Sequence, residues 1–478
     1  MKKNFLSLDT FLATRISLGL FVSAFLIAGT LLIFLANGTA GEGDSCYHYQ
    51  FARYSWKHHE LFFDHWAKPL YVLIASPFAQ LGFKSVKFFN LFLYAFTMIL
   101  TWRVANLLFI KRSSLSALFL VTSPMLFIYT LSGLTEPLFA FVLVACILLY
   151  LKDKTWLAII LLSFLPFVRS EGLMMCGVFG LLLFLEKKYF FIPVLLTGHI
   201  VYSIAGYLNH KELLWVFTKI PYAVLQTDYG KGPWSHFFVN LPNIIGWVLC
   251  VFMAIGFLQV FSLLNNFVRK KENARELFLI YGCFLAYFMA HVCFWAMGIF
   301  HSFGLLRPIV GILPLMALIE LKGFNFVADS IPFEKAKPYL VAAFVIAVII
   351  SPFTIWNYKR DFCLNDTQIP QQQMGEYIRK HYPDYKSYNF YFDANYIAMV
   401  LDVDIFDKNI CRYTWETWEH PPSNKSLMLW DEWYSPVEIK TSYATVINDG
   451  RFELVKEFVK YDEWGFEKKT VLFKGKAK

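Results

Sequence analysis

The residues best suited to chemistry follow directly on the first membrane-length apolar run of the chain. Residues 16–36 carry no charge and are long enough to cross a bilayer, and Glu42 and Asp44 come just after them. Aromatic side chains, histidines and cations are dense beyond this point, among them His48 and Lys68. A carboxylate at the membrane edge can take a proton from a hydroxyl group. We therefore predict Asp44 as a general base, with a pKa raised by its aromatic neighbours, and Glu42 as the second candidate.

Further charged residues stand at the ends of later apolar runs. Glu136 precedes one such run; it either complements the start of a helix or serves as a third candidate acid. Arg169 and Glu171 lie between two short runs, where they form an ordinary ion pair or hold a phosphate, which suits the planar guanidinium group. Arg307 lies inside an apolar segment. Because a cation in a membrane is energetically costly, its presence there indicates a function. We predict these three residues, Arg169, Glu171 and Arg307, as substrate contacts.

The segment from Asp228 to His236 combines two glycines with basic and aromatic residues. It matches no nucleotide-binding pattern, so as a phosphate loop its signal is weak. We nevertheless predict Lys231, Trp234 and His236 as substrate contacts, together with His301, and we add His48 and Lys68 from the first long loop.

Two other sets of residues leave alternatives open. The spacing of four histidines fits no tight zinc motif, so a divalent metal ion stays an open alternative and no cofactor is required: His48, His58, His59 and His65. Most of the 8 cysteines fall in apolar runs, but Cys363 and Cys411 lie outside them and a bridge between them is an alternative to two free thiols.

Composition places the chain in a membrane. Of 478 residues, 57% are hydrophobic, 19% are aromatic and only 17% are charged. About eleven apolar runs are spaced as spans, and the net charge of +9 comes from basic loops between them, which the positive-inside rule assigns to the cytoplasm. If residues 69–82 crossed the membrane, every later basic loop would move to the outer side, against the positive-inside rule. We therefore predict an interfacial or re-entrant helix there, inside an outer loop over 37–87.

Beyond residue 357 the chain becomes polar, aromatic and balanced in charge. Segments 387–392, 427–430 and 470–473 are predicted strands, and 374–381 a predicted helix. We therefore predict two domains: an α-helical polytopic membrane domain over 1–357 and a small extracytoplasmic α/β domain over 358–478.

The order of these features resembles the GT-C superfamily, membrane glycosyltransferases that use polyprenyl-phosphate-linked sugars. The segment from Asp228 to Gly246 resembles the Tyr-Gly and Pro-Trp-His segment of the dolichol-phosphate-mannose-dependent mannosyltransferases, and the segment from His301 to Pro314 looks like the end of their histidine-arginine-proline motif. Asp44-Ser-Cys-Tyr-His-Tyr resembles the acidic-aromatic start of their first loop. The resemblance covers roughly residues 10–320, although the charged core between His301 and Arg307 is absent.

The resemblance implies an inverting hexosyltransferase with a mannose-like donor sugar. Asp44 would deprotonate the acceptor hydroxyl, while Arg169 and Arg307, with His301 or Lys231, would hold the donor phosphate. The partners would be a polyprenyl-phosphate sugar, the bilayer, and a glycan, lipid or protein acceptor, with no nucleic acid. We expect the bacterial inner membrane rather than the endoplasmic reticulum. A transporter or flippase of lipid-linked substrates and a non-catalytic membrane scaffold are the alternatives.

Overall fold

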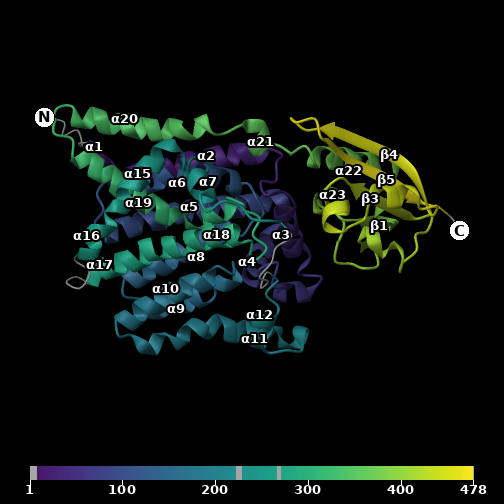
Figure 1. The fold of residues 1–478 in the computed structure, drawn as a ribbon, viewed down its shortest axis with the longest axis horizontal. Coiled ribbons are helices and arrows are strands. Elements are labelled where there is room, and N and C mark those ends of the chain that lie inside the picture. Colours follow the sequence, from purple (N-terminus) through teal and green to yellow (C-terminus); the bar gives the residue numbers. More distant parts are fainter. Residues whose placement is uncertain (1–7, 222–228, 266–270, 477–478) are drawn as a thin grey trace.

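The computed structural model describes residues 8–221, 229–265 and 271–476. Its helices lie alongside one another in a bundle, with helix α1 (Leu8–Phe11) at one end and a C-terminal domain at the other (Figure 1). Within the described residues, seven helical stretches are long and apolar enough to cross a membrane: Arg15–Leu35, Phe83–Leu107, Tyr189–His210, Trp247–Asn265, Asn273–Met297, Arg307–Asp329 and Lys337–Thr354. The prediction of a helical polytopic membrane fold is therefore confirmed.

The bundle is built from these long helices and from shorter apolar ones between them. The main helices are α2 (Arg15–Leu35), α5 (Phe83–Leu107), α8 (Glu136–Leu151), α9 (Thr155–Ser163), α10 (Gly172–Leu185), α11 (Thr197–His210), α15 (Trp247–Leu258), α16 (Val260–Asn265), α17 (Lys271–Glu276), α18 (Cys283–Met297), α19 (Leu313–Asp329) and α20 (Lys337–Ile350). Helices α15 and α19 approach closely at Gly256 and Gly323, where an added Cβ on either residue would meet the backbone of the other helix.

Two predicted apolar segments take a different form from a single span. The run over 114–131 is divided into α6 (Leu115–Val121) and α7 (Pro124–Thr130), because Pro124 has no N–H to continue the first helix. Residues 69–82 form α4 (Pro69–Ala79), whose 11 residues extend about 16 Å and so fall well short of a bilayer core of about 30 Å. The segment is thus a short helix, and its interfacial or re-entrant position stays a prediction.

The end of the bundle beside the C-terminal domain carries α3 (Glu42–Tyr54), α4 and α12 (Trp215–Thr218), and the short helices α13 (His236–Val239) and α14 (Leu241–Ile245) precede α15 in the chain. Helix α3 is the surface on which the C-terminal domain packs. The Phe406 ring lies 4.7 Å from that of Phe51, and Asp404 lies 2.9 Å from both Lys57 and His58. Tyr434 packs so tightly on Gly43 that a Cβ there would collide with the tyrosine hydroxyl.

The C-terminal domain is a mixed sheet with helices on both faces. Its strands are β1 (Asn389–Phe392), β2 (Cys411–Arg412), β3 (Ser426–Asp431), β4 (Phe452–Tyr461) and β5 (Glu467–Gly475), in the order β2-β1-β3-β5-β4, and its helices are α21 (Tyr358–Phe362), α22 (Gln368–His381), α23 (Asn395–Leu401) and α24 (Tyr443–Ile447). Helices α22 and α23 pack on one face of the sheet and α24 on the other. Strand β3 is central and wholly buried: Leu427 and Leu429 face one core, and Met428 and Trp430 the other. The predicted strands and helix all occur.

The structure also bears on two alternatives that the sequence left open, a disulfide bridge and a metal site formed by histidines. Cys363 and Cys411 are both free thiols. Within the described residues, no group of three or more histidine, cysteine or acidic side chains is arranged to hold a metal ion. The four histidines have different partners: His48 stacks on Trp66, His58 contacts Asp404, His59 stacks on Phe62, and His65 contacts the carbonyl of residue 216 at 3.1 Å.

Candidate functional site

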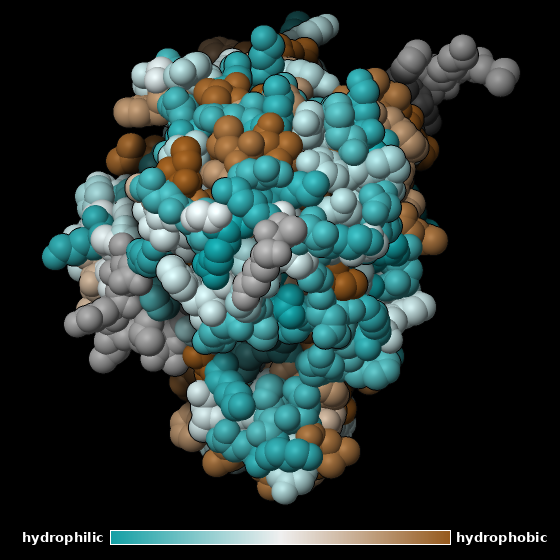
Figure 2. Space-filling model, turned by 90° about the vertical axis from the view of Figure 1, so that its right-hand side faces the viewer, coloured by the Kyte–Doolittle hydropathy of each residue, from teal (hydrophilic) through white to brown (hydrophobic). Residues whose placement is uncertain are grey.

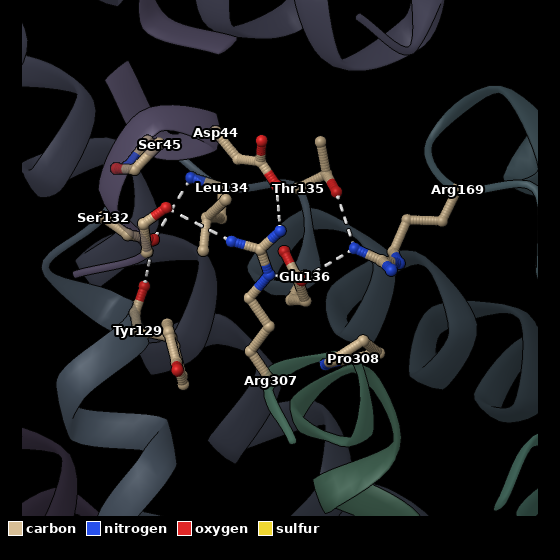
Figure 3. A network of polar contacts seen from close by, with 12 residues as sticks. Asp44, Ser45, Tyr129, Ser132, Leu134, Thr135, Glu136, Arg169, Arg307 and Pro308 are labelled. Carbon is tan, nitrogen blue, oxygen red and sulfur yellow. Dashed lines mark hydrogen bonds and ion pairs between the residues drawn. The ribbon is translucent and has the colours of Figure 1, made fainter. Parts of the chain in front are cut away.

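Asp44 and Arg307 meet at the end of the bundle that carries the C-terminal domain. Asp44 lies in the first turn of α3, where the sequence suggested a loop, and its carboxylate forms an ion pair with Arg307 Nη2 (Figure 3). Arg307 Nη1 donates to the carbonyl of Gly41 at 3.3 Å. Gly41 has a φ of 106° and lies against Leu134, so a side chain at this position would be strained and would crowd the arginine. The tight turn before α3 therefore brings the carboxylate to the guanidinium.

Glu136 connects this pair to a second arginine. It is the first residue of α8 and is completely buried, with Oε1 2.7 Å from Arg169 Nη1 and 3.8 Å from Arg307 Nε (Figure 3). Thr135 makes no capping hydrogen bond to α8, and its hydroxyl instead accepts from Arg169 at 3.2 Å. The geometry thus gives Glu136 the role of bridging two guanidinium groups.

The ionic chain continues beyond Arg169 to a residue that the sequence did not single out. Arg169 Nη2 lies 2.8 Å from Glu171, and Glu171 lies 3.5 Å from Nε2 of His291 on α18. A histidine inside an apolar span was the only available signal for His291. Arg169 is therefore held from two sides by acidic residues, Glu136 and Glu171.

Lys68 and His48 lie beside this ionic chain. Lys68 precedes α4 with a φ of 67°, and its ammonium group donates to Ser170 Oγ at 3.0 Å. Burial lowers the pKa of Lys68 to about 8, against the opposing effect of Glu171. His48 is stacked on Trp66 with ring centroids 4.8 Å apart, and burial lowers the pKa of His48 to about 3, so its ring is neutral at physiological pH.

The ionisation of Asp44 differs from the sequence prediction. Burial acts to raise the pKa of Asp44, but the charge of Arg307 and its hydrogen bond, with a smaller contribution from Arg169, leave the pKa below its ordinary value. The prediction of a raised pKa is therefore wrong, because the sequence does not show which cation lies beside the acid. Asp44 is ionised at neutral pH, and 45% of its side chain is exposed, whereas Glu136 has no exposure. Of these two acids, Asp44 is the one a substrate can reach.

The described part of the glycine-containing segment, residues 229–236, contacts residues that lie shortly before Arg307 in the chain. His236 Nε2 lies 2.7 Å from the carbonyl of Gly304, and the Gly232 amide donates to the carbonyl of Trp295 at 3.2 Å. The ring of His301 contacts that of Tyr229. The segment therefore packs on the turn that leads to Arg307.

Two predicted residues on this side, Lys231 and Trp234, are less informative about the site. Lys231 and Trp234 are exposed, with 58% of Trp234 accessible. Asp228 lies outside the described residues, as does the side chain of Glu42. Figure 2 shows the whole end face: it is mostly hydrophilic and has a hollow below the C-terminal domain, above the lobe that holds α11 and α12.

Comparison with solved structures places this architecture among known folds. No family model and no curated protein matches the chain by sequence. The structure of ArnT from Cupriavidus metallidurans bound to undecaprenyl phosphate aligns with a TM-score of 0.60 at 10% identity, over 95% of this chain and 97% of that one. Its apo form aligns with a TM-score of 0.56 at 9% identity, over the same shares.

An oligosaccharyltransferase from Archaeoglobus fulgidus, tethered to an acceptor peptide, has a similar fold. It aligns with a TM-score of 0.52 at 10% identity, over 86% of this chain and 69% of that one. ArnT and this enzyme are both GT-C superfamily glycosyltransferases. The chain therefore has the GT-C fold, as its sequence resemblance predicted.

Proposed function

We propose that this protein is an inverting membrane glycosyltransferase, which moves a mannose-like hexose from a polyprenyl-phosphate carrier to a hydroxyl group of an acceptor. The observation that carries the proposal is the Asp44–Arg307 ion pair at one end of a GT-C fold. A carboxylate that is ionised and accessible stands there beside two arginines and a lysine, which together match an acceptor hydroxyl and a phosphate.

The reaction needs one base and one anion-binding group. Asp44 takes the proton of the acceptor hydroxyl, the hydroxyl oxygen forms a bond to the anomeric carbon, and the bond from that carbon to the phosphate oxygen breaks. The polyprenyl phosphate leaves with the electron pair of the broken bond. Arg307, Arg169 and Lys68 hold the growing negative charge on the phosphate through hydrogen bonds from cationic donors.

The existing ion pair links donor binding to activation of the base. Arg307 is held by Asp44, so a donor phosphate that binds Arg307 must displace this carboxylate. Once the guanidinium is taken by the phosphate, the main influence that depresses the pKa of Asp44 is weakened. Asp44 then becomes a stronger base only when the donor is bound. Before the donor binds, the lowered pKa of Asp44 makes unproductive proton uptake less favourable.

The remaining predicted residues have supporting parts in this proposal. Glu136 and Glu171 position Arg169 from within the protein. His48 stands next to the base as a neutral polar group, and Glu42 remains the second candidate base. Contacts to the substrates are further proposed for the residues on the side of the glycine-containing segment: Lys231, Trp234, His236 and His301.

The proposal also assigns a membrane orientation. The basic loops would face the cytoplasm, and the Asp44 end with the domain 358–478 would face outward, in the bacterial inner membrane. A reporter inserted after residue 112 should then be cytoplasmic, while one at the C-terminus should be external. A cytoplasmic C-terminus would refute the one-sided site.

The decisive test of function uses purified full-length protein and synthetic polyprenyl-phosphate hexoses that carry mannose, glucose or galactose. Release of free polyprenyl phosphate, together with a new glycosidic product, supports the proposal. If the lipid-linked sugar instead crosses the membrane of a sealed vesicle with its phosphate bond intact, the protein is a flippase and the proposal fails.

A further inference from the structure

The C-terminal domain contains a pocket that the proposed reaction does not use. Its volume is about 150 Å³, and it lies between the turn Thr414–Thr417, residues 439–441 and α24. One water molecule needs about 10–15 Å³ on this measure, so the space accommodates roughly ten to fifteen non-hydrogen atoms. A single sugar ring has this size.

Two tryptophans in the pocket wall are left accessible to solvent. Trp415 is 45% exposed and Trp418 is 73% exposed, whereas Trp430 in the same domain is buried. The face of an indole ring carries partial negative charge, which attracts the partly positive C–H hydrogens on the face of a pyranose ring. Exposed tryptophans in a pocket of this size therefore suit a saccharide.

The ring of Trp418 is also held in place before any ligand binds. The Arg451 guanidinium lies 4.9 Å from its centroid. Arg451 is itself fixed by Asp449, at 2.6 Å between Nη2 and Oδ2, and by the carbonyl of Thr417, at 2.8 Å from Nη1. These bonds restrain the guanidinium, and the guanidinium in turn restrains the Trp418 ring. The ring therefore loses less freedom of motion when a ligand binds.

The polar groups around the pocket complement hydroxyl groups. Lys440 supplies donors, and the hydroxyl groups of Thr441 and Thr445 can donate and accept, while the carboxylate of Asp449 is already held by Arg451. Lys440 has a φ of 62°, which residues other than glycine adopt rarely and which concentrates at ligand sites. Arg451 is already neutralised by Asp449, so a neutral saccharide suits this wall better than a phosphate.

The pocket is tied to the Asp44 end of the molecule through a buried network. Thr414 and Ser435 both donate to one oxygen of Asp393, each at 2.7 Å. Tyr434, next to Ser435, packs against Gly43 in the same helical turn as Asp44. The pocket and the contact with the proposed catalytic end therefore belong to one connected part of the domain.

From this arrangement we infer that the pocket of the C-terminal domain is a saccharide-binding site, which holds a sugar ring of the acceptor while Asp44 acts on its hydroxyl elsewhere. The acceptor assignment rests on the proposed glycosyltransferase function, whereas saccharide binding itself does not. A single ring should bind with a Kd on the order of 1 mM.

The test measures binding of free mannose, glucose, galactose and N-acetylglucosamine to the full-length protein, by saturation-transfer NMR and tryptophan fluorescence. We expect saturable binding of at least one sugar, reduced at least tenfold by Trp418→Ala and by Trp415→Ala. Trp464→Ala removes an indole that is 75% exposed but outside the pocket, and should bind normally. Absence of binding in the native protein, or equal binding in all variants, overturns the inference.

Two further results separate this site from the catalytic one. Asp44→Asn should bind the free sugar with native affinity, and loss of binding there would mean that the sugar occupies the Asp44 end. In the transfer reaction, Trp418→Ala should raise the KM for a saccharide acceptor while leaving the donor KM unchanged. If sugars bind the pocket but no transfer occurs with any donor, the saccharide site stands and the proposed enzyme function fails.

Discussion

Replacement of Asp44 by asparagine tests the centre of the proposed mechanism. The change keeps the size of the side chain and leaves an oxygen for the Arg307 hydrogen bond, but the amide cannot take a proton at working pH. Loss of a general base typically lowers the rate about 10²–10⁴-fold, which corresponds to about 3–5 kcal/mol of transition-state stabilisation. We expect this loss in kcat with little change in donor KM.

The fold should tolerate the same change. The Asp44 side chain is 45% exposed, and the largely buried Arg307 keeps its contacts with the asparagine oxygen, Gly41 and Glu136, so the unfolding temperature should move little. Asp402→Asn is the matched control: Asp402 also lies in an accessible ion-pair cluster, with Arg53 3.7 Å and Lys386 3.4 Å away. Its left-handed φ of 51° is one that asparagine tolerates.

The assay measures release of polyprenyl phosphate under single-turnover conditions, so that product release does not hide the chemical step. A native rate in Asp44→Asn would refute the assignment of the base. If Glu42→Gln were inactive in the same assay, the base would be Glu42 and the class of enzyme would stand. A loss in Asp402→Asn equal to that in Asp44→Asn would show a general effect of the substitution.

Four other outcomes follow from the contacts of the site. Arg307→Lys keeps the charge but loses the planar fork, so donor kcat/KM should fall at least about tenfold, while Arg360→Lys on the exposed helix α21 should leave it unchanged. Glu136→Gln removes the charge of a fully buried carboxylate that pairs with the mostly buried Arg169, and should lower the free energy of unfolding by about 3–5 kcal/mol in a thermal melt. Because Lys68 loses its charge as the pH rises through its pKa of about 8, donor kcat/KM should decline above that pH, and in Lys68→Arg the decline should disappear. Gly43→Ala should loosen the C-terminal domain, seen as faster proteolysis of the linker after α20, because the added methyl collides with a tyrosine of that domain.

Much of the architecture follows from local properties of the chain. Long uncharged runs must cross a bilayer as helices, because unpaired backbone groups are too costly in lipid, so the spans are visible in the sequence. A short continuous apolar run such as that of β3 predicts a strand that is buried on both faces. Local pattern was less reliable where a single residue changes the helix, as Pro124 does.

The site depended on distances that no local pattern contains. The sequence marked Asp44, Glu136, Arg169 and Arg307 as unusual because charge is rare at membrane depth, and this is a property of each residue alone. Their pairing into one ionic chain, the part of His291 in it, and the lowered pKa of Asp44 arise only when α3, α8, α18 and the start of the Arg307 span meet. Electrostatic effects depend on which charges lie within a few ångströms of each other, and only the tertiary structure decides that.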